Sequence, residues 1–136
     1  ARAGKENDMS DCCCGNNKKK TVLIYACSGG ANVAEISDKA ARQLMFEGQG
    51  SMFCLAGLGA GIQGMIQTAK DADVNLVIDG CPMDCAKKVF EKAGITNYTC
   101  LKVTDLGIEK TKGVRAADDQ VAKVVAQARE ILAHCS

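Results

Sequence analysis

Apolar residues in this chain occur in two alternating kinds of segment. Short and nearly continuous apolar runs occupy residues 21–27, 51–56, 76–79 and 97–104. Runs of this length and composition are typical of strands that are covered on both faces, as in a parallel sheet. Between and after them, apolar residues recur every three or four positions, which indicates helices with one buried face.

Four helices follow from this second pattern. Their predicted buried positions are, in chain order, Val33, Ile36, Ala40 and Leu44; Ile62, Met65, Ile66 and Ala69; Ala86, Val89, Phe90 and Ala93; and Val121, Val124, Val125, Ala128, Ile131 and Leu132. A glycine loop at residues 57–61 precedes the second helix. Pro82 suits the first turn of the third helix, and Gly94 suits its end. Asp118 or Asp119 is expected to cap the last helix.

The alternation β-α-β-α-β-α-β-α predicts a single three-layer α/β domain of the Rossmann or flavodoxin-like type, with a mainly parallel four-stranded sheet. We expect this domain to span residues 20–136. Residues 1–19 are polar and are expected to form a disordered tail that contains Cys12, Cys13 and Cys14. Within it, residues 1–8 precede Met9 and resemble a vector-derived leader.

Composition narrows the possible functions. The net charge of +1 gives no electrostatic reason to expect binding to nucleic acid or to an anionic membrane. No apolar run approaches the roughly 20 residues of a membrane-spanning helix, and the N-terminus lacks a signal peptide. Nine cysteines cannot all pair with one another. A cytoplasmic protein with reduced thiols is therefore expected.

Four cysteines lie at or near predicted strand ends. Cys27 closes the first run, Cys54 lies in the second, and Cys81 and Cys85 follow the third. Because parallel strands place their carboxyl ends at one edge of the sheet, these four sulfurs can converge there. If residues 82–85 form a helical turn, the helix dipole favours the thiolate form of both later cysteines. Gathered thiolates bind soft or borderline metals or perform redox chemistry.

Several motifs together resemble those of the DGC-domain family of proposed zinc-binding proteins. They are YACSGG at residues 25–30, CLAGLGAG at 54–61, DGCPMDCAKK at 79–88 and TDLGI at 104–108. The resemblance covers residues 20–133, approximately, and leaves the tail cysteines outside. It implies a metal site formed by Cys27, Cys54, Cys81 and Cys85, but it implies no particular reaction.

Four thiolates around Zn²⁺ form a closed tetrahedral site, which favours a structural, regulatory or metal-handling role over catalysis. Were Cys54 to point elsewhere, three sulfurs would leave an open metal position. Asp79 could bind the metal or hydrogen-bond near it, although capping of a helix or loop is its commoner role. Four glycines are expected to line the site or to bind an anion through their backbone: Gly29, Gly30, Gly59 and Gly61.

Other functions remain open at this point. The same cysteines could serve a thiol redox or iron–sulfur protein, although the sequence contains no C-x2-C pair. Gly59, Gly61 and Gly64 satisfy the G-x-G-x-x-G pattern of dinucleotide-binding loops, and Asp79 lies twenty residues after the first of them. This pattern follows the second strand, however, where such a loop follows the first strand in dinucleotide-binding folds.

The remaining candidates have simpler explanations. The loop after Cys27 lacks the arginine that a phosphatase-like or arsenate-reductase-like loop requires. Cys100 is expected to be a core residue in mid-strand, and His134 to lie at a fraying helix end. The tail cysteines could capture a thiophilic metal transiently or be inert.

Overall fold

A parallel sheet forms the middle layer of the domain. The computed structural model describes residues 19–135. Its strands are β1 (Val22–Ala26), β2 (Ser51–Met52), β3 (Val74–Asp79) and β4 (Thr99–Lys102). They lie in the order β2-β1-β3-β4, and every neighbouring pair is parallel. The predicted α/β fold with a four-stranded parallel sheet is confirmed.

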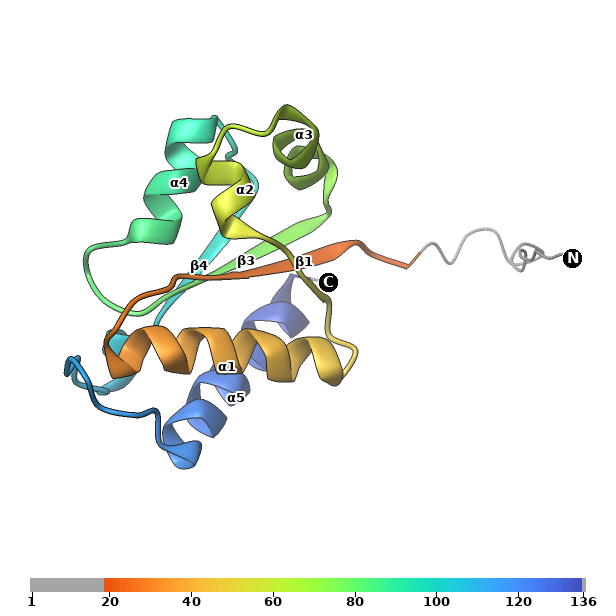
Figure 1. The fold of residues 1–136 in the computed structure, drawn as a ribbon. Coiled ribbons are helices and arrows are strands. Elements are labelled where there is room, and N and C mark those ends of the chain that lie inside the picture. Colours follow the sequence, from red (N-terminus) through yellow and green to blue (C-terminus); the bar gives the residue numbers. More distant parts are fainter. Residues whose placement is uncertain (1–18, 136) are drawn as a thin grey trace, which may run out of the picture.

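Helices cover both faces of this sheet (Figure 1). On one face lie α1 (Asn32–Phe46) and α5 (Asp118–His134), and on the other lie α2 (Leu55–Gly59), α3 (Gln63–Asp71) and α4 (Cys85–Ala93). A short 3-10 helix, η1 (Val103–Leu106), follows β4.

The core has two parts because strand side chains alternate between the faces of the sheet. Ile24, Leu76 and Ile78 pack toward α1 and α5. Tyr25 and Val77 pack on the opposite side, among the buried residues of α2, α3 and α4. Both faces of the sheet are therefore packed against helices.

Three predicted strands are longer than the observed ones, the first, over residues 21–27, by only one residue at each end. The second was expected over residues 51–56 but ends at Met52, because the chain turns into α2 directly after Cys54. The fourth was expected over residues 97–104 but ends at Lys102, where η1 begins. Cys54 therefore lies beyond its strand, in the N-cap position of α2.

Two predicted helix starts are also wrong. Pro82 does not begin a helix: the chain turns after β3, and α4 begins only at Cys85. The residue before it, Asp84, has φ +54°, which breaks any continuous helix from Pro82. The last helix is preceded by Ala117 in the N-cap position, and Asp118 is its first helical residue.

The parallel arrangement brings the loops after β1, β2 and β3 to one edge of the sheet. All four candidate metal ligands lie on these loops or at the helix starts that follow them. The predicted tail spans residues 1–19, and of these the structure describes only Lys19. The expected leader and the cysteines Cys12, Cys13 and Cys14 therefore lie outside the described residues.

Candidate metal centre

The candidate cysteines lie in the connections that follow β1, β2 and β3 or at the helix start that ends one of them. Cys27 directly follows β1 and is buried, with 9% of its surface exposed. Cys81 lies two residues after β3 and is half-buried. Cys54 and Cys85 are exposed, one just before α2 and the other as the first residue of α4.

The four cysteines line two cavities at this edge of the sheet. One, of about 660 Å³, is lined by Cys27, Cys54 and Cys85. The other, of about 390 Å³, is lined by Cys27, Cys81 and Cys85. The two cavities share Cys27 and Cys85, with Cys54 on one side of this pair and Cys81 on the other.

The sulfur atoms do not meet at one point in this arrangement. Within residues 19–135, no three Cys, His, Asp or Glu side chains are grouped closely enough to hold one metal ion. The donor set fits zinc by its chemistry, because thiolates are preferred zinc ligands. Cys27 and Cys85 line both cavities and would be the shared ligands, whereas Cys54 and Cys81 would have to approach them.

The start of α4 is held by a carboxylate from the sheet. Asp79, the last residue of β3, is only 2% exposed. It accepts hydrogen bonds from the backbone N–H of Ala86 at 2.9 Å and of Lys87 at 3.0 Å. Asp84, in the N-cap position, makes no such bond and instead pairs with Lys102 at 3.1 Å. Asp79 therefore caps the helix in its place and fixes the position of Cys85.

Gly80 joins the ends of β1 and β3. Its backbone N–H donates to the Cys27 Sγ at 3.1 Å. A Cβ built on Gly80 would lie 2.9 Å from the Val33 Cγ2 and 3.0 Å from the Val33 carbonyl carbon, so only glycine allows this close approach to α1. In the D-G-C sequence, the first two residues thus position two of the candidate ligands.

The environment of Cys27 favours its protonated form until a cation approaches. Burial raises the pKa of the Cys27 thiol, and hydrogen bonds from Gly80 and with Ser37 oppose this effect. A thiol in this position is less reactive than an exposed one, and a metal ion must displace its proton.

Three basic residues surround the cysteines. Arg42 lines the first cavity, and Lys110 and Lys112 line the second. The Lys110 Nζ donates to the Cys81 Sγ at 3.5 Å. Sequence reasoning missed these residues because no local motif signals their approach from distant parts of the chain.

The predicted glycines separate into two groups. Gly29 and Gly30 line the second cysteine cavity. Gly59 and Gly61 instead line a cavity of about 250 Å³ that none of the four candidate cysteines lines. Gly59 ends α2, so the G-x-G-x-x-G sequence is not the strand-to-helix loop that binds a dinucleotide.

Two other sequence expectations can be compared with the structure. Cys100 was expected in the core, but it is exposed on β4, the edge strand, so that prediction is wrong. His134 is the last residue of α5, and its Nδ1 lies 2.8 Å from the Glu130 carbonyl oxygen. This confirms its place at a helix end.

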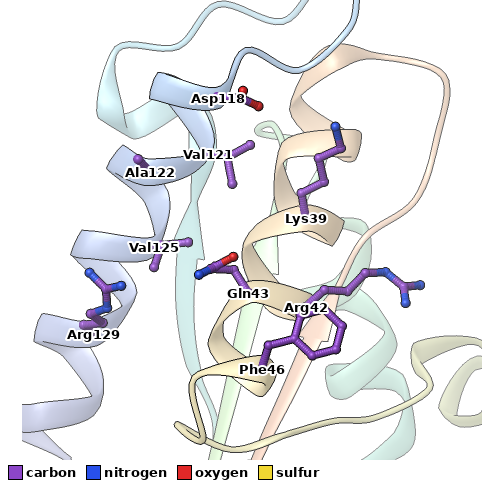
Figure 2. A pocket seen from close by; sticks show the side chains of 9 residues that line it. All are labelled: Lys39, Arg42, Gln43, Phe46, Asp118, Val121, Ala122, Val125 and Arg129. Atoms are coloured by element: carbon purple, nitrogen blue, oxygen red, sulfur yellow. The ribbon is translucent and has the colours of Figure 1, made fainter.

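A groove between α1 and α5 lies apart from the cysteines (Figure 2). It measures about 490 Å³, and its lining includes Phe46, Val121, Val125 and Arg129. Phe46 is 77% exposed. The basic side chains beside it are already paired with acidic ones, as Arg129 is with Glu47. The three basic residues that line the groove, Lys39, Arg42 and Arg129, are thus all paired.

Among residues 19–135, no helix combines the length and apolar character needed to cross a membrane. No solved structure is significantly similar to this chain.

Two comparisons relate this chain to known proteins. The chain is 31% identical over 91 residues to the anaerobic and virulence modulator AnvM of Pseudomonas aeruginosa strain PAO1. The alignment covers 67% of this chain and 70% of AnvM. The sequence model of the DGC domain matches residues 23–128, from β1 into α5. This protein belongs to the DGC domain family.

Proposed function

We propose that this protein binds one Zn²⁺ through the thiolates of Cys27, Cys54, Cys81 and Cys85, in a structural, regulatory or metal-handling role. The observation that carries the proposal is the pair of cavities that share Cys27 and Cys85. Each cavity adds one further cysteine from a different connection. Cys54 and Cys81 would complete the site by moving toward the shared pair.

Local charge supports this donor set. Four thiolates and one Zn²⁺ carry a formal charge of −2, which is costly at a partly buried site unless nearby groups offset it. The Gly80 N–H on Cys27 and the Lys110 ammonium on Cys81 both donate to sulfur.

The two halves of the site differ in how firmly they are held. Cys27 and Cys85 are fixed by Gly80 and Asp79. Cys54 precedes a helix of only five residues, and the turn that carries Cys81 is free of regular structure. Zinc binding would therefore draw Cys54 and Cys81 toward the fixed pair.

A zinc ion with four thiolate ligands has no coordination position for water, so it would hold connections together rather than activate a nucleophile. Loss of the ion would free the α2 connection and the turn before α4, which gives a physical basis for regulation. The name of AnvM, a modulator, is consistent with such a role.

The test is the zinc content of protein purified without added metal, measured by elemental analysis together with a free-thiol count. We expect one zinc per chain and a reduced content when each of the four cysteines is changed singly to serine. Cys100→Ser and Cys135→Ser are the matched controls and should keep full zinc content.

The same measurement separates the alternatives. Full zinc content in Cys81→Ser contradicts the four-cysteine site. A brown protein that contains iron and inorganic sulfide supports the iron–sulfur alternative. Metal-free protein with reversible disulfide formation supports the thiol redox alternative.

A further inference from the structure

A segment from late in the chain runs across the cysteine edge. Residues 109–113, here called the basic strap, follow η1 and precede α5 and carry Lys110 and Lys112. The strap pairs with the start of α1 through an antiparallel bridge between Ala31 and Lys112. The Gly113 N–H donates to the Gly30 carbonyl at 3.0 Å, next to this bridge.

One buried side chain fixes the strap in this position. Asn32, the first residue of α1, is only 5% exposed. Its Nδ2 donates to the Glu109 carbonyl at 2.9 Å, and its Oδ1 accepts from the Thr111 N–H at 2.7 Å. Its own backbone N–H donates to the Thr111 carbonyl at 3.0 Å. Asn32 thus holds the backbone on both sides of Lys110.

This anchoring determines which lysine meets a sulfur. Lys110 lies between the two strap residues that Asn32 binds, and its Nζ lies 3.5 Å from the Cys81 Sγ. Lys112 lines the same cavity, yet its ammonium group makes no hydrogen bond to a sulfur in the described part of the chain. The two lysines therefore form a matched pair, equal in charge and different in contact.

We propose that Lys110 is the fixed countercharge of the zinc–thiolate site and that Asn32 is the positioning residue that holds it there. This inference rests on the proposed zinc site. An ammonium group that donates to a metal-bound sulfur offsets part of the negative charge of the site. A lysine on an unanchored loop would lose much of this benefit, because binding would then have to order the backbone that carries it.

The experiment measures zinc affinity by competition with a chromophoric chelator, and the melting temperature of each metal-free variant. We expect Lys110→Met to bind zinc about threefold to tenfold more weakly than the unchanged protein. Lys112→Met should stay within about twofold, and Lys110→Arg should restore most of the affinity, because arginine keeps the charge and the donors. Both lysines are exposed, so the melting temperatures should change little.

Asn32→Ala tests the positioning role through a double-mutant cycle. It should weaken zinc binding, and adding Lys110→Met to it should then have almost no further effect. If the two changes instead weaken binding independently, Asn32 does not act through Lys110. If Asn32→Ala fails to fold, the comparison of Lys110→Met with Lys112→Met still decides the role of Lys110.

Failure of the proposed function can be distinguished from failure of this inference alone. Unchanged protein that binds no zinc overturns the proposed function and this inference with it. Unchanged protein that binds one zinc, with equal affinities for Lys110→Met and Lys112→Met, overturns this inference alone.

Discussion

Replacing Asp79 with asparagine should destabilise the whole domain, although Asp79 lies at a strand end. Its carboxylate accepts the backbone N–H groups of Ala86 and Lys87 at 2.9 and 3.0 Å and is 2% exposed. An asparagine keeps one acceptor oxygen, so one of the two N–H groups would face another donor. A hydrogen bond to a charged group contributes about 1.5–3 kcal/mol, and an anion at a helix N-terminus adds about 0.3–1 kcal/mol.

We therefore expect Asp79→Asn to lower the free energy of unfolding by about 2–3 kcal/mol and the melting temperature by about 10 °C. Urea unfolding followed by circular dichroism measures the first quantity, since the chain contains no tryptophan to report by fluorescence. Asp73→Asn is the matched control: Asp73 also accepts a backbone N–H, from Thr21 at 2.7 Å, but is exposed. A change of less than about 0.5 kcal/mol relative to this control would refute the capping role of Asp79.

Three further changes test other parts of the structure. Gly80→Ala should lower the free energy of unfolding by about 2 kcal/mol or more, because the added Cβ would meet the backbone of α1. Gly30→Ala is the control: a Cβ there has open space, so the same urea assay should show a loss under about 0.5 kcal/mol. Asn75→Ala should lower the free energy of unfolding by about 3 kcal/mol. This fully buried amide donates to two backbone carbonyls and accepts from a tyrosine hydroxyl. An unchanged urea midpoint would contradict the prediction. Hydrogen bonds from Arg129 hold the pKa of Glu47 below its ordinary value of 4.5. Their stabilisation is therefore present above about pH 4.5 and is lost as the pH falls through the lower pKa of the folded state, so Glu47→Gln should reduce the difference between melting temperatures at pH 7 and pH 3.

The fold was predictable from the sequence because it depends on patterns that repeat over many residues. Fully apolar runs such as the one around Leu76 identify strands buried on both faces. The spacing of Val124, Val125, Ala128 and Leu132 identifies a helix with one buried stripe, and all four are buried. Boundaries depend on single residues instead. Nothing in the apolar run that contains Cys54 indicates that the chain leaves the sheet after Met52.

The candidate site was only partly predictable for a related reason. All strands of a parallel sheet run in the same direction, so their carboxyl ends share one edge. The common edge of Cys27, Cys81 and Cys85 could therefore be expected. The basic strap could not, because Glu109 and Thr111, to which Asn32 is hydrogen-bonded, lie 77 and 79 positions from it in the sequence. The hydrogen bonds of Asp79 likewise depend on the start of α4 at Cys85, which Pro82 did not indicate.

X-ray absorption at the zinc edge tests the central claim most directly, because it counts the ligands of the metal without assuming which residues supply them. For the unchanged protein loaded with one equivalent of zinc, we predict four sulfur neighbours at about 2.3 Å. The Cys54→Ser and Cys81→Ser variants should each lose one sulfur. A first shell dominated by nitrogen or oxygen at about 2.0–2.2 Å, or a sulfur count that neither substitution changes, would contradict the four-cysteine site.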